Sequence, residues 1–396
     1  IALGHKALGT ATVTGTQNIA IGLNAGTDIT SGSYNILFGR NIASGLTTGG
    51  SNIAMGTGTL GGDLASTVTG SSNVMIGNLS AVGATSAGYN TMVGEQAGRC
   101  LVDTGCNALF GYLAGLRMRG SYNTAFGAFA LTGSSTAANN TGGCNIALGK
   151  NSGAAMTSGS RNIFMGCCSG ATATQATNNV FLGLNAGQNL LDTSSNVFIG
   201  NATGKCNRGD SNIAMGNEAF TGSATPANNT GSHNVTFGTT AAQAITSGSD
   251  NVAIGRLTGA AITSGSNNVI IGECSGYKTT TTHDNTYIGQ GAGKCMQGSQ
   301  NFAGGYRALF GLGSGATGSH NIAIGCYAAC TVSSGGCNVA IGKEAGRTIR
   351  TGSENVFIGN CSGANVATGE GCSIAIGYYA YQSGQSTGQQ IFIGKQ

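Results

Sequence analysis

Large side chains and charges are scarce in this chain. It contains no tryptophan, and aromatic residues make up 6% and charged residues 8% of its 396 residues. A compact globular domain needs large side chains to fill its centre, so this composition argues against one. The basic residues are spread thinly along the sequence, without clusters, which argues against a nucleic-acid partner. No apolar run approaches the length of a membrane span, so we expect no membrane insertion.

Small residues and short apolar runs are abundant instead. Glycine accounts for 72 residues, hydrophobic residues for 40%, and the net charge is only +4. A chain with this apolar content and low charge is not expected to be disordered. Glycine, serine, threonine and asparagine, alternating with short runs of valine and isoleucine, indicate many brief strands joined by tight turns. The composition does not shift along the chain, which favours one continuous domain over residues 1–396.

An asparagine recurs along the whole sequence, most often every 17 residues. In Asn251–Gly259 it is followed by three apolar residues, a glycine, two variable residues and a small residue with a second glycine. We number each copy from this asparagine as position 1. A period of this length is too short for a helical hairpin and is typical of one coil of a β-solenoid. The sequence therefore predicts an all-β fold, a parallel β-solenoid (β-roll) of about 23 coils, with both ends uncapped.

Two columns of identical residues carry this prediction. Glycine occupies position 5 in every copy, which indicates either a backbone with positive φ or a close approach by another chain. The asparagine column predicts a ladder in which each side-chain amide bonds its equivalents in the coils above and below. The predicted ladder includes Asn18, Asn35, Asn52, Asn162, Asn251, Asn268 and Asn338.

The strand at positions 2–4 determines which side chains fill the coil. Alternate side chains of a strand point to opposite faces, and we expect positions 2 and 4 inside with position 3 outside. Position 3 is nevertheless apolar in nearly every copy, and so long an apolar stripe is too large to stay exposed on a soluble monomer. We therefore expect a subunit interface, and favour a homotrimeric prism over a back-to-back dimer. The predicted interface residues are Leu37, Met75, Met92, Leu109, Phe164, Phe181, Phe198, Ile270, Phe357 and Phe392.

Four copies are longer than the rest and predict enlarged loops. These loops fall near residues 57–72, 128–144, 217–233 and 306–320, and the last three recur at intervals of 89 residues. Loops repeated in this way could bind repeated sites with avidity, with a cell-surface glycan or protein as partner. The alternative is that they are spacers without a ligand. The residues proposed for contact are Asn139, Asn140, Asn228 and Asn229. The tripeptides Asn139-Asn140-Thr141 and Asn228-Asn229-Thr230 also fit the N-glycosylation pattern, which is meaningful only on a eukaryotic secretory route.

No catalytic or metal-binding pattern accompanies the repeat. The thirteen cysteines include no paired Cys-x-x-Cys set, which makes zinc binding unlikely. No carboxylate pair recurs at a fixed spacing, and neither a nucleophile elbow nor a phosphate-binding loop occurs. We therefore predict no catalytic residue, no metal site and no cofactor. Two alternatives remain open: a hexapeptide-type acyltransferase, of which only one hexad per copy fits, and an ice-binding solenoid, for which position 13 offers a single broken column of threonines.

The motif Asn-Ile-Ala-Ile-Gly-x-x-Ala-Gly, found at 18–26 and closely repeated at 251–259 and 338–346, resembles the head repeats of trimeric autotransporter adhesins. It is still more similar to the glycine-rich repeats of bacteriophage and large-virus tail-fibre proteins. The resemblance covers essentially the whole chain. It implies a trimer of β-rolls, displayed outside the cell or on a virion for attachment.

Together, the repeat and the resemblance lead us to expect a non-catalytic fibre or shaft protein for surface attachment, located extracellularly or on a virion surface. The alternative is an extracellular structural filament that assembles with itself and has no specific receptor.

Overall fold

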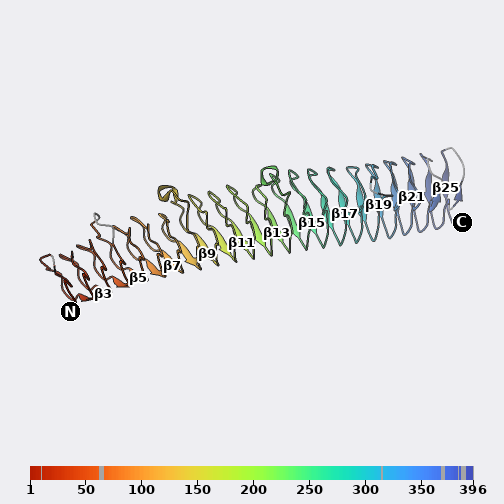
Figure 1. Ribbon diagram of the computed structural model, residues 1–396. Helices are drawn as coiled ribbons and strands as arrows, with labels where there is room; N and C mark the ends of the chain where they lie inside the picture. The colour runs from red at the N-terminus through yellow and green to blue at the C-terminus, as the bar shows by residue number, and fades with distance from the viewer. Residues whose placement is uncertain are drawn as a thin grey trace. The chain divides into compact units, whose positions relative to one another are not determined.

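The computed structural model describes residues 1–9, 11–61, 67–313, 315–366, 371–381, 383–384 and 389–395. The chain is an all-β parallel solenoid of about 22 coils with a 17-residue repeat and almost no helix, which confirms the predicted fold class. It divides into two compact units, residues 1–196 and 197–396. Both units are built from the same kind of coil (Figure 1).

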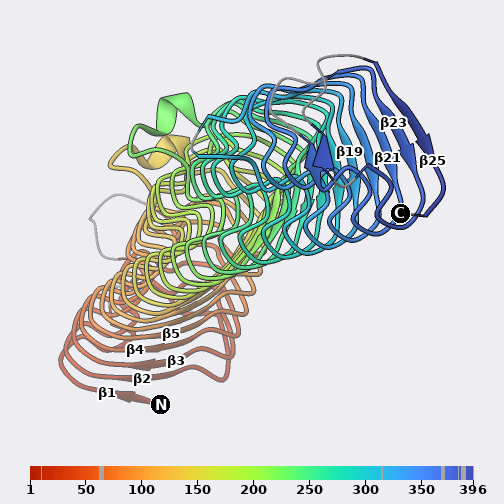
Figure 2. The ribbon, with the colours of Figure 1, turned by 90° about the vertical axis from the view of Figure 1, so that its right-hand side faces the viewer.

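In the first unit each coil contributes one short strand, which pairs in parallel and in register with the strands of the coils beside it. Strands β1 to β5 lie one above another along the same side of the unit (Figure 2). A short 3-10 helix, η1 (Ala137–Asn139), lies in the enlarged loop that follows β8. The strands are β1 (Ala2–Leu3), β2 (Ile19–Ile21), β3 (Ile36–Phe38), β4 (Ile53–Met55), β5 (Val74–Ile76), β6 (Thr91–Val93), β7 (Ala108–Phe110), β8 (Thr124–Phe126), β9 (Ile146–Leu148), β10 (Ile163–Met165) and β11 (Val180–Leu182).

The second unit repeats this arrangement, with η2 (Pro226–Asn228) in the enlarged loop after β13. Two further short strands, β22 and β24, pair with each other outside the main sheet. The strands are β12 (Val197–Ile199), β13 (Ile213–Met215), β14 (Val235–Phe237), β15 (Val252–Ile254), β16 (Val269–Ile271), β17 (Thr286–Ile288), β18 (Phe302–Gly304), β19 (Ile322–Ile324), β20 (Val339–Ile341), β21 (Val356–Ile358), β22 (Asn365–Val366), β23 (Ile374–Ile376), β24 (Ser383–Gly384) and β25 (Ile391–Ile393).

The asparagines at position 1 form the predicted amide ladder. Asn162 donates from Nδ2 to Oδ1 of Asn145 at 2.9 Å and to the Ala176 carbonyl at 2.6 Å. Its own Oδ1 accepts hydrogen bonds from the backbone N–H and from Nδ2 of Asn179, both at 3.0 Å. The side chain thus joins three coils and leaves none of its hydrogen-bonding groups unpaired. The other predicted members, Asn18, Asn35, Asn52, Asn251, Asn268 and Asn338, make the same inter-coil bonds.

Glycine at position 5 is required for two reasons at once. Its φ lies between +121° and +149° in every described copy, a region that side chains avoid. A Cβ on Gly94 would also lie 2.4 Å from the carbonyl oxygen of Gly111, which is position 5 of the next coil. The sequence offered a close approach by another chain as one explanation for this glycine. The backbone that approaches it belongs instead to the next coil of the same chain, and it excludes a side chain in addition to the positive φ.

The interior of each coil is narrow and is filled by positions 3, 8, 9 and 12. Position 3 carries the largest side chain in several coils, and Phe164, Phe181 and Phe198 are completely buried. The rings of Phe164 and Phe181 contact each other with centroids 5.4 Å apart. Each ring also packs against the glycine at position 9: a Cβ on Gly170 would lie 2.7 Å from the ring of Phe164. The core is therefore one aromatic or aliphatic side chain thick in each coil.

The predicted orientation of the strand is wrong. Position 3 faces inward and positions 2 and 4 face outward, so the alternation is right and its phase is inverted. The physical reason is that only the side opposite position 3 offers the small residues at positions 8 and 9 against which a large side chain can pack. Of the residues predicted for a subunit interface, Phe392 is half-buried and the others are buried inside their own coils: Leu37, Met75, Met92, Leu109, Phe164, Phe181, Phe198, Ile270 and Phe357.

Packing inside the coil also explains why position 3 is alanine in the enlarged coils. In these coils the glycine at position 9 is replaced by a large residue, which fills the space that a large position 3 would occupy. The pairs are Ala54 with Leu60, Ala125 with Leu131, Ala214 with Phe220, and Ala303 with Leu309, all completely buried. In these four coils, position 9 thus supplies the volume that position 3 supplies in coils such as that of Phe164.

Tyr287 is the one polar ring at position 3 among the described coils. Its side chain is completely buried, and its hydroxyl lies close to the Asn301 side chain without forming a well-directed hydrogen bond to any described residue. Burial raises the pKa of this phenol well above its usual range, so it stays neutral. We expect Tyr287→Phe to raise the free energy of unfolding by about 1 kcal/mol, because it removes an unsatisfied buried hydroxyl. Chemical denaturation followed by circular dichroism tests this, and destabilisation would show that the hydroxyl has a partner.

Candidate functional site

The most extended surface feature of each unit is the outer sheet face, formed by the side chains at positions 2 and 4. These side chains are mostly aliphatic or aromatic and project from consecutive strands. Phe38 is 52% exposed and Phe126 is 59% exposed, although both rings are fully apolar. In the first unit the large exposed side chains of this face include Ile36, Phe38, Ile53, Met55, Ile76, Phe126, Ile146 and Met165. In the second they include Ile213, Met215, Ile288, Phe302, Ile322, Ile324, Ile358, Ile376, Ile391 and Ile393.

Composition alone could not identify this face, because positions 2, 3 and 4 are all apolar. A signal was nevertheless present in the sequence. In the four enlarged coils, alanine at position 3 accompanies a large residue at position 9, as expected for residues that share a cavity, and this pairing does not involve positions 2 and 4. The apolar stripe that we expected is therefore present, and it is made by the neighbouring residues of the same strands.

The enlarged loop near residues 128–144, in the first unit, is closed by a buried asparagine. Asn140 accepts at Oδ1 from the backbone N–H and the hydroxyl of Ser134, both at 3.0 Å. Its Nδ2 donates to the carbonyl oxygens of Arg117 and Ser134, both at 3.1 Å. All the hydrogen-bonding capacity of this amide is used within the chain, so Asn140 is a structural clasp and not the contact residue that we predicted.

The enlarged loop near residues 217–233, in the second unit, is closed in the same way. Asn229 accepts from the N–H of Ser223 at 3.0 Å and donates to the Cys206 carbonyl at 2.9 Å. Asn139 and Asn228, the residues before each clasp, are exposed at the ends of η1 and η2. They remain available for contact or glycosylation. Of the other two loops, residues 62–66 and 314 lie outside the described residues.

A polar groove lies on one side of the enlarged loop near residues 128–144. Ser134, Ser135, Thr136 and Asn139 line it from the loop, and Thr157, Ser158, Thr174 and Gln175 line it from the two coils that follow. Its lining is rich in hydroxyl and amide groups, with no charged side chain among the described residues. Such a surface offers hydrogen-bond donors and acceptors to an uncharged polar ligand.

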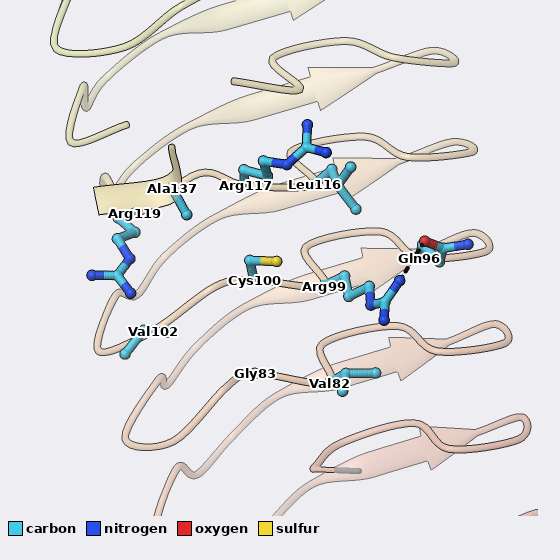
Figure 3. Close-up of a pocket in the computed structure, with 10 residues that line it drawn as sticks. All are labelled: Val82, Gly83, Gln96, Arg99, Cys100, Val102, Leu116, Arg117, Arg119 and Ala137. Carbon is cyan, nitrogen blue, oxygen red and sulfur yellow. Dashed lines mark hydrogen bonds between the residues drawn. The ribbon is translucent and has the colours of Figure 1, made fainter. Parts of the chain in front are cut away.

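An arginine-lined notch of about 440 Å³ lies on the other side of the same loop. Arg99 comes from one coil, Arg117 and Arg119 come from the next, and Ala137 of η1 contributes from the loop (Figure 3). Val82, Val102 and Leu116 add apolar surface. The sequence showed no basic cluster because the stacking of coils, and not sequence adjacency, brings Arg99 close to the other two.

The cysteines and carboxylates do not form a reactive or metal-binding group in the part of the chain that the structure describes. None of the thirteen cysteines forms a disulfide within the described part of the chain. The nearest pair, Cys167 and Cys168, are sequence neighbours with their sulfur atoms 3.2 Å apart. Within the described ranges, no cluster of three or more histidine, cysteine, aspartate or glutamate side chains could hold a metal ion.

The sequence matches no protein-family model and no curated protein. Among the described residues, no helix has the length and apolar character needed to cross a lipid bilayer. The outer sheet face, the two clasped loops and the arginine-lined notch are therefore the features on which a function can be argued.

Proposed function

We propose that this protein is a non-catalytic structural fibre or shaft for surface attachment, assembled from several copies of the chain through the outer sheet face. The observation that supports this most directly is the row of exposed apolar side chains at positions 2 and 4. Isolated exposed apolar residues are ordinary, but a continuous row along a sheet is a site of association or aggregation.

A second copy of the same chain is the partner that fits this row best. The apolar side chains recur once per strand, at about 4.8 Å, the spacing of neighbouring strands in a sheet. Another copy has the same spacing, so its apolar residues can match coil for coil along the whole face. Symmetric association of identical chains is also the commonest form of oligomer.

A homotrimer suits the width of the face. Each coil presents only two outward side chains, which is narrow for the back-to-back contact of two flat sheets. In a three-fold prism, position 2 of one chain can contact position 4 of its neighbour, so each narrow row has two partners. The enlarged loops lie away from this face and remain free for attachment outside the cell or on a virion surface.

The experiment replaces apolar residues of the face by lysine. Phe38→Lys combined with Met165→Lys should weaken association at least about 100-fold, because unpaired charges are costly to bury. The matched control is Leu23→Lys combined with Leu184→Lys, which changes two exposed leucines at position 6, outside the face. Sedimentation velocity at about 10 µM, a working concentration chosen for micromolar assembly, should give a trimer for the wild type and control and a monomer for the face variant.

A wild-type chain that sediments as a monomer would contradict the proposal, as would equal behaviour of the two variants. Electron microscopy separates the two forms of the proposal: rods of fixed length support an attachment fibre, whereas filaments of unlimited length support a self-assembling filament without a receptor.

A further inference from the structure

The arginine-lined notch carries the positive charges of three guanidinium groups. Arg117 ends a turn and Arg119 follows it, on either side of the completely buried Met118, and Arg117 is half-buried whereas Arg119 is exposed. Arg99 donates to the neutral side chain of Gln96 at 3.1 Å. The described residues that line the notch include no carboxylate. Arginine is the side chain best suited to bind the oxygens of carboxylate, sulfate or phosphate groups.

Asp103, an acidic side chain that interacts electrostatically with Arg119, is held by two hydroxyl groups. Asp103 accepts a hydrogen bond from the Thr85 hydroxyl at 2.7 Å and another from the Ser86 hydroxyl. These bonds lower the pKa of its carboxyl group, with Arg119 making the smallest contribution. Asp103 therefore stays ionised and is held by these hydroxyl groups, and among the described residues of the notch it interacts electrostatically with Arg119 alone, which leaves Arg99 and Arg117 available to a ligand.

The arrangement of the guanidinium groups indicates the kind of anion. In Figure 3 the three groups surround the notch and point in different directions, without converging on one point. A single small ion would contact only one of them well. A chain that carries several anionic groups could contact all three, while its uncharged parts lie on Val82, Val102 and Leu116.

The surfaces on the two sides of the loop indicate which other chemical groups the ligand carries. Ala137 lines the notch, whereas its neighbours Thr136 and Ala138 line the groove with its hydroxyl and amide groups. An extended ligand that crosses this loop would meet cationic groups on one side and neutral hydrogen-bonding groups on the other. We propose that the notch and groove together bind an anionic polysaccharide that carries sulfate or phosphate groups.

The second unit carries basic residues at corresponding places. The coil before its η2 loop has Lys205 and Arg208 at positions 10 and 13, where the first unit has Leu116 and Arg119. The backbone N–H of Arg208 bonds the carbonyl of the loop clasp Asn229 at 2.6 Å, as that of Arg119 bonds Asn140 at 2.7 Å. Each unit thus places an arginine beside a clasped loop, so each unit has basic residues at the place where the polymer would bind.

The test uses the full chain and a heparin-derived octasaccharide, studied by isothermal titration calorimetry at low and moderate salt. Arg117→Gln combined with Arg119→Gln should weaken binding at least about tenfold, because each lost guanidinium removes charge-assisted hydrogen bonds. Lys150→Gln combined with Arg161→Gln is the control: it removes the same charge from exposed residues outside the notch. The control should bind within about twofold of the wild type, and wild-type binding should weaken as salt rises.

The probe itself is varied to identify the ligand. The fully desulfated octasaccharide should not bind, and inositol hexaphosphate should bind only if phosphate can replace sulfate. The proposal is overturned if the wild type does not bind the sulfated octasaccharide, if both double variants lose affinity equally, or if a single-stranded oligonucleotide of equal charge binds more tightly. Circular dichroism verifies that each variant is folded.

This inference rests on the attachment role proposed above, but on different residues. The notch lies on the segment opposite the strands, so covering the outer sheet face leaves it open. The lysine variant Phe38→Lys with Met165→Lys should therefore bind the octasaccharide with the same affinity per chain. Failure of trimer formation and failure of glycan binding can in this way be recognised separately.

Discussion

Replacing Asn162 with alanine should lower the free energy of unfolding by about 2–5 kcal/mol. The change leaves the Ala176 carbonyl and the Asn179 backbone N–H without their side-chain partner inside the coil. Each buried polar group left unsatisfied costs about 1–3 kcal/mol. The loss should be centred on the coils on either side of residue 162, because in a solenoid each coil contacts only its neighbours. Hydrogen exchange measured coil by coil, together with urea denaturation, checks both the size and the location of the effect.

Asn78→Ala is the matched control for this prediction. Asn78 is exposed at position 6 and lies outside the ladder, so its replacement should change stability by less than about 0.5 kcal/mol. Equal effects of the two substitutions would show that the ladder does not contribute to stability. In one coil, Ser373 replaces the asparagine at position 1. The buried hydroxyl of Ser373 has no hydrogen-bond partner among the described residues.

Two neighbouring glycines of the second unit should respond in opposite ways to the same substitution. Gly305 occupies position 5, with a φ of +127°, and a Cβ there would lie 2.9 Å from the carbonyl group of Gly325. We expect Gly305→Ala to destabilise the chain by about 3 kcal/mol, from the unfavourable φ combined with the collision with the next coil. Denaturant titration of the purified variants gives the difference in free energy.

Gly304 provides the comparison within the same strand. It occupies position 4 on the outer sheet face, and a Cβ there would meet only the ring of Phe302, at 3.4 Å. Gly304→Ala should be neutral or stabilise the chain by up to about 1 kcal/mol, since alanine restricts the unfolded chain. If both variants lost the same stability, the requirement at position 5 would be no more than a general preference for glycine in this strand.

The period of the sequence determined most of the fold, because a coil must return to the same place after each repeat. The 17-residue spacing, the asparagine column and the glycine at position 5 each predicted a feature that depends on one coil lying directly on the next. The orientation of the strand could not be obtained in this way. Ile36 and Leu37 are equally apolar, and which of them faces inward depends on the space left by position 9 across the coil.

The candidate sites were harder to predict, since they depend on contacts between coils at positions that do not repeat. Asn139 and Asn140 are adjacent and chemically identical, yet one is exposed and the other is completely buried as the loop clasp. Similarly, 18 positions separate Arg99 from Arg117 in the sequence. Their proximity follows from the stacking of one coil on the next, together with the exact positions that each residue occupies within its coil.

The shared cavity of positions 3 and 9 has a consequence for how such a chain can change by mutation. A single substitution that enlarges one position, such as Ala125→Phe beside Leu131, overfills the coil, and one that shrinks a position leaves it empty. The two changes together restore the volume while the outer surface stays as it was. In the enlarged coils, one interior packing arrangement can therefore replace the other only through paired substitutions, and each exchange leaves the outer surface of the chain unchanged.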